Sequence, residues 1–372
     1  PHAMGGMQRH SRLLAEHLAR MPGIELLVLH PHTSMFPPDL KVVEVHVPDI
    51  DRGRFYLSEL WKYSDRIADK LDEVKPDVIL SQGFCVWKGI DRFSDRLAVM
   101  PHGLEMFQGL TWKDRLMTWP FRRALRAIVQ RSSVVVSLGG KLTGILQGLA
   151  AGSPCRVVVI PNATDVPNPP PSPPSPPSPP SPPSPPSPSS PSSPVHLLFV
   201  GRFAFNKGLD VLMEVAARLV KDGRGAAVRF QLAGNGPLLA HYQRIGLPSN
   251  VEVLGRVDDA RLATLYADCD ALILPTRFEG MPTVVLEAMA RAKPIVVSDV
   301  GASSELVDVH NGYLLPPGDA EALYHAVRSF VERPRDVHRK MGEVSYARVK
   351  ERFAWPVVME QFKELIAGLS KS

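Results

Sequence analysis

The sequence of 372 residues is poor in cysteine, in long apolar runs and in clustered charge of one sign. Its three cysteines, Cys85, Cys155 and Cys269, are odd in number and lie far apart, outside the spacing of metal ligands. We therefore expect buried, reduced thiols and a reducing compartment. No apolar run approaches the ~20 residues that a membrane-spanning helix needs. The sequence thus disfavours a disulfide-rich scaffold, a cysteine metal site and a membrane-spanning protein.

The excess of basic residues is small, with 43 Lys and Arg against 38 Asp and Glu and a net charge of +5. Such a charge suits an anionic sugar nucleotide or a peripheral contact with an anionic membrane. No dense Lys/Arg block with interleaved aromatics occurs, so we expect no nucleic-acid partner. The length allows two domains with sizeable cores. Without a signal peptide or membrane segment, we expect the cytoplasm or an organellar stroma, and an upstream targeting peptide stays open.

Proline is unevenly distributed along the chain. Residues 166–194 consist largely of Ser-Pro-Pro repeats and hold 17 of the 37 prolines. Such a segment cannot pack a core and favours an extended polyproline II conformation. We interpret it as a disordered linker between two domains. The alternative is a ligand for SH3- or WW-type modules.

Apolar strand-like runs alternate with helix-like stretches on both sides of this segment. Before it we expect strands at 24–30, 42–47, 76–80, 97–100, 134–137 and 156–160, and helices at 7–21, 57–74, 112–130 and 141–149. After it we expect strands at 196–200, 230–233, 251–254, 271–274, 295–298 and 311–315, and helices at 209–220, 262–268, 283–293, 320–331, 337–348 and 357–369. This alternation predicts an α/β protein with parallel sheets covered on both faces.

The run from Pro275 to Ala290 organises the second half. It follows a short buried strand and passes Gly280 and Pro282 before the expected helix at Thr283. The first amides of such a helix lack internal partners and suit a phosphate. Glu279 and Glu287 lie eight residues apart, so they would contact different parts of one elongated ligand. The alternative is a surface loop with two solvated glutamates.

These residues carry a family resemblance. The order Glu-Gly-Met-Pro from Glu279, a second glutamate at Glu287 and the Leu-Glu-Ala-Met-Ala helix resemble the signature of family 4 retaining glycosyltransferases. The resemblance implies the GT-B fold, two Rossmann-like domains facing across a cleft. It implies an acceptor-side domain at 1–165, completed by a terminal helix at 356–370, and a nucleotide-sugar domain at 195–355.

The N-terminal domain departs from the family pattern. Its Gly5-Gly6 turn resembles the loop that follows the first strand in the family and faces the phosphates or the acceptor. That apolar first strand, which is central in such a sheet, is absent. Either an upstream segment is missing from this sequence or the fold compensates. The turn at Pro161-Asn162-Ala163 resembles another family motif, in which Ala163 replaces a glycine and leaves a positive φ in doubt.

The resemblance also assigns the remaining site residues. Arg202 and Lys207 bracket the loop before a helix, where two cations match a diphosphate leaving group. His102 follows the strand at 97–100 and would contact the donor sugar. The resemblance implies a catalytic set of His102, Arg202, Lys207 and Glu279. The donor-binding set is Gly6, Gly234, Asn235, Gly236, Val257, Gly280, Met281, Pro282, Thr283 and Glu287.

The expected activity is transfer of a sugar, with retained configuration, from a UDP- or GDP-sugar to a hydroxyl of a glycan, lipid or small molecule. No Asp-x-Asp motif occurs in a suitable loop, and the cations above can offset the leaving charge, so we expect no metal and no other cofactor. The alternative is a non-catalytic GT-B remnant that acts as an interaction scaffold through its proline-rich arm.

Overall fold

The computed structural model describes residues 6–32, 34–50, 56–108, 112–167 and 193–370. The chain divides into two compact units. The first unit comprises Pro1–Ala163, Glu279–Thr283 and Trp355–Ser372, and the second comprises Thr164–Phe278 and Val284–Ala354. The contacts thus group the short segment Glu279–Thr283 with the first unit.

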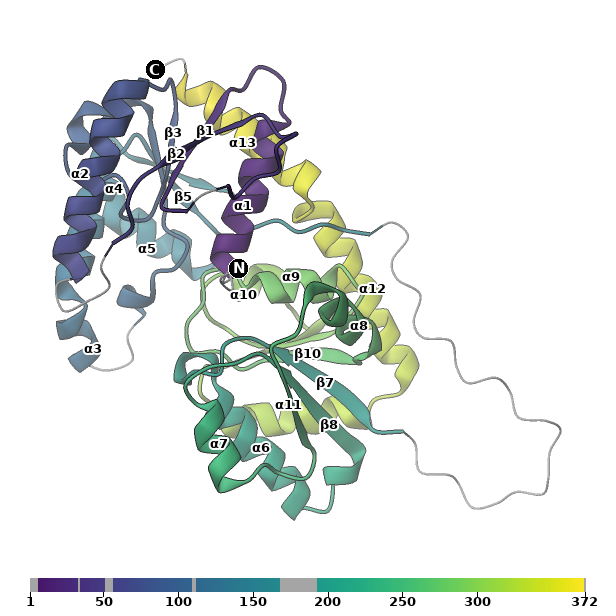
Figure 1. Cartoon of the computed structure of the whole chain (residues 1–372). Helices are drawn as coiled ribbons and strands as arrows, with labels where there is room; N and C mark the ends of the chain where they lie inside the picture. Colours follow the sequence, from purple (N-terminus) through teal and green to yellow (C-terminus); the bar gives the residue numbers. More distant parts are fainter. Residues whose placement is uncertain (1–5, 33, 51–55, 109–111, 168–192, 371–372) are drawn as a thin grey trace, which may run out of the picture. The chain divides into compact units, whose positions relative to one another are not determined.

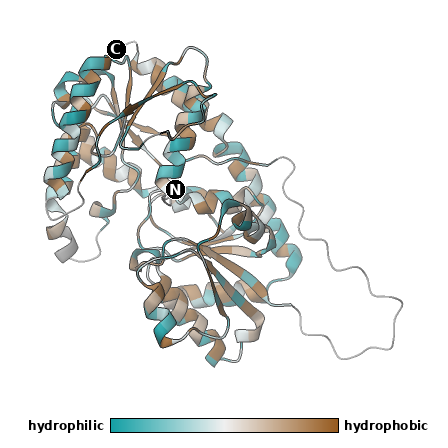
Figure 2. Ribbon diagram, in the orientation of Figure 1, coloured by the Kyte–Doolittle hydropathy of each residue, from teal (hydrophilic) through white to brown (hydrophobic). Residues whose placement is uncertain are grey.

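The second unit contains one six-stranded parallel sheet with the order β12-β11-β10-β7-β8-β9. Its strands are β7 (Val195–Val200), β8 (Val228–Ala233), β9 (Val251–Gly255), β10 (Ala271–Leu274), β11 (Ile295–Ser298) and β12 (Gly312–Leu315). This is the doubly wound order, in which the direction of strand addition reverses between β7 and β10 (Figure 1). All six strands were predicted from their apolar runs, and Figure 2 shows their hydrophobic character.

Helices cover this sheet. They are α6 (Leu209–Lys221), α7 (Leu239–Ile245), α8 (Asp259–Asp268), α9 (Thr283–Met289), α10 (Ser303–Leu306), α11 (Ala320–Glu332) and α12 (Arg335–Arg352). The short helices α7 and α10 were not predicted. The helix expected at 283–293 ends at Met289, because Ala292 takes a left-handed conformation with φ 56° and Lys293 N–H donates to the carbonyl of Ala288.

The first unit contains two separate parallel sheets. One has the order β3-β4-β5-β6, with β3 (Ile79–Gln82), β4 (Leu97–Met100), β5 (Val134–Ser137) and β6 (Arg156–Val159). The other pairs β1 (Leu26–His30) with β2 (Val42–His46). Among the described residues no strand joins these sheets, which agrees with a Rossmann-like domain that lacks its first strand. Helices α1 (Gly6–Ala19), α2 (Tyr56–Val74) and α5 (Lys141–Ala150) complete the layers.

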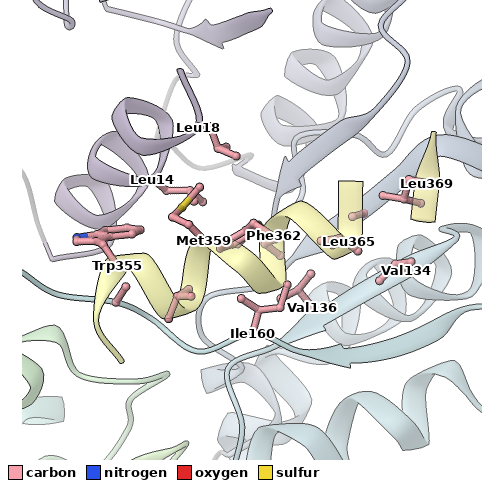
Figure 3. Close-up of a cluster of buried hydrophobic side chains, with 14 residues drawn as sticks. Leu14, Leu18, Val134, Val136, Ile160, Trp355, Met359, Phe362, Leu365 and Leu369 are labelled. Atoms are coloured by element: carbon pink, nitrogen blue, oxygen red, sulfur yellow. The ribbon is translucent and has the colours of Figure 1, made fainter. Parts of the chain in front are cut away.

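The terminal helix α13 (Trp355–Leu369) belongs to the core of the first unit. Its apolar side chains recur every three or four residues and form one stripe. Figure 3 shows this stripe between α1 and the four-stranded sheet. The stripe contains Trp355, Val358, Met359, Phe362, Leu365 and Leu369, and it packs with Leu14, Leu18, Val134, Val136 and Ile160.

The prediction of one helix at 112–130 is wrong, because the structure has two helices there. These are α3 (Trp112–Met117) and α4 (Trp119–Arg131), and Thr118 separates them. Pro120 causes the break, since it has no N–H to donate to the preceding turn and its ring clashes there. Proline fits the first turn of a helix, where it stands in α4.

Both described ends of the proline-rich segment are bonded to α12. The Tyr346 hydroxyl donates to the carbonyl of Pro167 at 2.6 Å, and the Arg335 guanidinium donates to the carbonyls of Ser193 and Pro194 at 3.3 and 3.4 Å. The linker, with its SH3 or WW alternative, was predicted at 166–194, and residues 168–192 of that segment lie outside the described residues.

The three cysteines are free thiols. Cys155 and Cys269 are buried as predicted, whereas Cys85 is only half-buried because it lies in the loop after β3. Burial raises the pKa of Cys269 to about 12, so this thiol stays protonated at neutral pH. In the described part of the chain, no helix is long and apolar enough to cross a membrane.

Candidate functional site

The carboxyl ends of β7 and β10 lie side by side at the point where the strand order reverses. Ligands of open α/β sheets bind outside the carboxyl ends of the strands at such a point. The loop after β7 holds Arg202 and, in the short helix η4 (Phe205–Lys207), Lys207. The segment Pro275–Phe278 follows β10. Arg202 is exposed and Lys207 half-buried.

The two segments are bonded to each other. Arg277 N–H donates to the carbonyl of Asn206 at 2.8 Å, and the Thr276 hydroxyl donates to the same carbonyl at 2.9 Å. Gly208 has φ 68°, and a Cβ at that position would lie 1.8 Å from the carbonyl oxygen of Pro275. Only glycine fits this approach. The backbone that carries Lys207 is therefore held against the segment after β10.

The Arg277 side chain fixes the same loop. It is 9% exposed and donates to both carboxylate oxygens of Asp210, each at 2.7 Å. It also donates to the carbonyl of Phe205 at 2.8 Å, and its guanidinium lies 4.0 Å from the centroid of the Phe205 ring. A planar guanidinium can form the two-bond fork to the Asp210 carboxylate and also stack on the Phe205 ring, whereas a lysine ammonium cannot.

The loop after β8 packs against the loop after β7. Gly234 has φ 146°, and a Cβ there would lie 1.9 Å from the carbonyl oxygen of Gly201. Phe203 N–H donates to the carbonyl of Asn235 at 2.9 Å, and a Cβ at Gly236 would lie 2.4 Å from the carbonyl oxygen of Phe203. The structure thus brings Arg202, Lys207 and the glycine loop together at one end of the sheet.

Glu287 lies on α9 and is half-buried. The Tyr266 hydroxyl, on the buried face of α8, donates to Glu287 Oε2 at 2.9 Å. Burial first, and then the charge of Glu287, raises the pKa of Tyr266 well above its usual value, so the phenol remains a donor. Arg291 donates to the main-chain carbonyl of Glu287 at 3.0 Å. Of these two bonds, the one from Tyr266 orients the Glu287 carboxylate.

His102 in the first unit follows β4 and bonds through Nε2 to Gln82 Oε1, at the end of β3. Burial lowers the pKa of His102 to about 4, so the ring is neutral near pH 7. Because the Gln82 oxygen can only accept, Nε2 carries the proton and Nδ1 is left as an acceptor. Such a ring can receive a hydrogen bond from a sugar hydroxyl.

Segment Glu279–Thr283 contacts His102 within the first unit. A Cβ at Gly280 would lie 1.9 Å from the carbonyl oxygen of His102. Asn162 Nδ2 donates to the carbonyl of Met281 at 2.9 Å. Met281 and Pro282 are buried. Pro282 has no N–H, so of the three predicted residues Met281 to Thr283 only Met281 and Thr283 have an amide that could meet a phosphate.

The remaining predicted positions are more scattered. Gly6 opens α1, and a Cβ there would lie 3.0 Å from the Thr283 hydroxyl, while Gly5 lies outside the described residues. Val257 follows β9, at the edge of the sheet. Ala163 has no positive φ, since Ser34, Lys75 and Ala292 are the non-glycine residues of the described chain that have one. Its N–H donates to His10 Nε2 at 3.1 Å.

Two family models match this chain. The model described as Glycosyltransferase Family 4 matches residues 4–167, and the model described as Glycosyl transferases group 1 matches residues 194–333. The chain belongs to the family 4, group 1 glycosyltransferases. Residues 168–193, which lie between the two matches, include most of the proline-rich segment.

Relatives of this family 4 protein include the alpha-D-kanosaminyltransferase of Streptomyces kanamyceticus, 29% identical over 40% of the chain and 39% of that enzyme. The chain spans less than half the length of the curated relatives it matches. The sucrose-phosphate synthase of Thermosynechococcus elongatus has a TM-score of 0.77 at 20% identity, covering 98% of this chain and 94% of that one. Anabaena HepE, solved with UDP and glucose, has a TM-score of 0.69 at 18% identity, covering 98% and 96%. These two structures show the shared GT-B fold.

Three residues at the site of this family 4 protein were not predicted from the sequence: Asp210, Tyr266 and Arg277. Each acts through a partner that is distant in the sequence, 67 residues for the Arg277–Asp210 pair and 21 for the Tyr266–Glu287 pair. Arg277 stands in the motif run, but its charge alone indicates only a solvated side chain. Within the described residues, no group of three or more His, Cys, Asp or Glu could hold a metal ion.

Proposed function

We propose that the chain is a retaining glycosyltransferase that uses a UDP- or GDP-sugar and needs no metal. The observation that carries the proposal is the pair of cations, Arg202 and Lys207, on a loop fixed at the switch point of the second sheet. They would stabilise the charge that develops on the departing diphosphate. HepE, which shares the fold, was solved with UDP and with UDP-glucose, which supports a nucleotide-sugar donor.

The other site residues take supporting roles in this proposal. Glu287, oriented by Tyr266, would accept hydrogen bonds from the ribose diol. The backbone of Gly234–Gly236 and Val257 would contact the nucleotide. We assign the sugar hydroxyls to Glu279 and the neutral His102. Retention requires the acceptor hydroxyl to attack from the face that the diphosphate leaves, and the leaving phosphate would take the proton.

A rate assay with a panel of sugar nucleotides tests the proposal. Lys207→Ala and Glu279→Ala should each lower transfer by at least ~100-fold, the scale of losing a charge-stabilising group. Lys221→Ala is the matched control, since this exposed lysine ends α6, which begins two residues after Lys207. Unchanged turnover in both site variants rejects the proposal. Product that has inverted its anomeric configuration rejects the retaining mechanism.

The scaffold alternative predicts a different result. A non-catalytic remnant would show thermal stabilisation by a nucleotide without sugar transfer from any donor in the panel. The family match and the fixed Lys207 loop favour the enzyme.

A further inference from the structure

Helices α3 and α4 present large apolar side chains to solvent. Trp112, Leu116, Met117 and Trp119 are 71%, 66%, 77% and 56% exposed. Trp112 and Leu116 are four residues apart and share one side of α3. Single exposed apolar residues are ordinary, but four within eight residues are an unusual concentration of apolar side chains at the surface.

The supporting helix is firmly anchored. One side of α4 is buried through Ala124, Leu125, Ile128 and Val129. The Thr118 hydroxyl, at the junction of the two helices, donates to the carbonyl of Met106 at 3.1 Å. Trp119 therefore stands on an anchored helix, and α3 is joined to that helix at Thr118.

Arginines accompany the apolar residues. Arg122, Arg123 and Arg126 lie three, four and seven residues after Trp119, which places them on the same side of α4. Arg123 and Arg126 are exposed and Arg122 is half-buried. The Arg123 guanidinium lies 5.7 Å from the Trp119 ring and that of Arg122 lies 5.0 Å from the Phe107 ring. We call this set, from Trp112 to Arg126, the α3–α4 surface.

The charge of this region is strongly one-sided. Residues 112–131 contain six basic residues and one acidic residue, while the whole chain has a net charge of only +5. Two acidic groups of neighbouring elements reduce this charge: Asp91 lies 3.8 Å from the Arg131 guanidinium, and Glu105 of the helix η3 (Glu105–Phe107) is exposed. Tryptophan, leucine and methionine beside several arginines are typical of a segment that lies in the headgroup region of an anionic bilayer.

We propose that the α3–α4 surface docks the protein on anionic membrane lipids. The apolar side chains would enter the boundary between headgroups and acyl chains, where tryptophan is favoured. The arginines would pair with lipid phosphates. A second copy of this chain fits the surface less well, because a symmetric contact would bring the same arginines together. The proposal is independent of the proposed glycosyl transfer, since docking requires no sugar nucleotide.

Co-sedimentation of the full chain with vesicles tests this proposal. We expect binding to phosphatidylcholine mixed with phosphatidylglycerol, weak binding to phosphatidylcholine alone, and a loss of binding as salt is raised. Trp112→Ser with Trp119→Ser should weaken binding by on the order of tenfold or more. Arg122→Gln with Arg123→Gln should weaken it by on the order of tenfold and reduce its salt dependence, because each arginine near the surface contributes about fivefold.

Val309→Ser is the matched control, since this valine is 80% exposed but lies in the second unit. Its binding should equal that of the wild type. Unchanged melting temperatures show that each variant is folded. The proposal is overturned if the wild type ignores anionic vesicles, or if both double variants bind them as the wild type does. It is also overturned if the tryptophan variant abolishes self-association in the absence of lipid while vesicle binding persists.

Discussion

Replacing Arg277 by methionine should both destabilise the second unit and slow sugar transfer. Methionine is unbranched and can fill much of the space, but it cannot form the fork to Asp210 or the bond to the carbonyl of Phe205. Because these bonds hold the loop that carries Lys207, losing them would leave that cation poorly positioned for a diphosphate.

The expected loss of stability in Arg277→Met follows from how exposed Arg277 and Asp210 are. Breaking a fully buried ion pair costs roughly 3–5 kcal/mol, whereas exposed pairs contribute about 0–1 kcal/mol. Arg277 is 9% exposed and Asp210 is 38% exposed, so this pair lies between those limits. We expect a loss of about 2 kcal/mol in the free energy of unfolding. For a unit of this size that corresponds to a drop of roughly 4 to 8 °C in melting temperature.

Thermal unfolding and the transfer rate would be measured for Arg277→Met, Arg277→Lys, Asp210→Asn and the double variant that combines Arg277→Met with Asp210→Asn. Lysine restores the charge but not the fork or the stack, so it should recover only part of the loss. Asp210→Asn should lower the stability much less in the Arg277→Met background than in the wild type, because the partner of Asp210 is already absent there. An equal cost in both backgrounds, or an unchanged melting temperature in Arg277→Met, refutes the reasoning.

Three further predictions address other parts of the site. Tyr266→Phe removes the donor to Glu287. Since a hydrogen bond to a charged group contributes about 1.5 kcal/mol or more to stability, the melting temperature should fall by roughly 3 to 6 °C. The less well oriented carboxylate should also raise the KM for the sugar nucleotide by roughly tenfold, and an unchanged KM contradicts the orienting role. Burial, and then the charge of His102, lowers the pKa of His10 from 6.5 to about 3. As pH falls below 6.5, His10 therefore becomes protonated in the unfolded chain but stays neutral in the folded chain. Stability is therefore lost as pH falls, by about 2 kcal/mol between pH 7 and pH 5 from His10 alone, and denaturation of His10→Gln should show a dependence that is shallower by this amount. Chelation with EDTA should leave the transfer rate unchanged, and a loss that Mg²⁺ restores would contradict a metal-independent reaction.

Local patterns in the sequence were sufficient for most of the fold. The buried strands at Leu97–Met100, Val134–Ser137 and Ala271–Leu274 have the predicted bounds, because a short apolar run between turn residues has few other solutions. The break at Thr118 was missed although Pro120 is visible in the sequence. The stretch is basic and periodic on both sides of Pro120, which favours one long helix, but an unkinked helix tolerates proline only in its first turn.

Sequence motifs predicted the parts of the candidate site that lie in loops directly after strands, but not its long-range contacts. Arg202, Lys207 and the Gly234 loop follow strands whose carboxyl ends share one edge of the sheet, so their proximity could be predicted from topology. The bond between His10 and Ala163 could not, because it joins residues 153 positions apart. Its physical basis is the packing of α1 beside the turn after β6, and no local pattern encodes that packing.

The bonds from α12 to Pro167, Ser193 and Pro194, on either side of the repeats, have a consequence for how this protein can vary. Arg335 and Tyr346 are eleven residues apart on one helix, so they hold the two anchor points at helix positions ~16 Å apart. An extended chain of about five residues spans such a gap. The 25 residues from 168 to 192 far exceed this number, so a change in their number leaves both anchor points within reach. Gain or loss of Ser-Pro-Pro units by slippage in the gene should therefore be almost neutral for folding, and related proteins can differ widely in repeat number while the sheets stay the same.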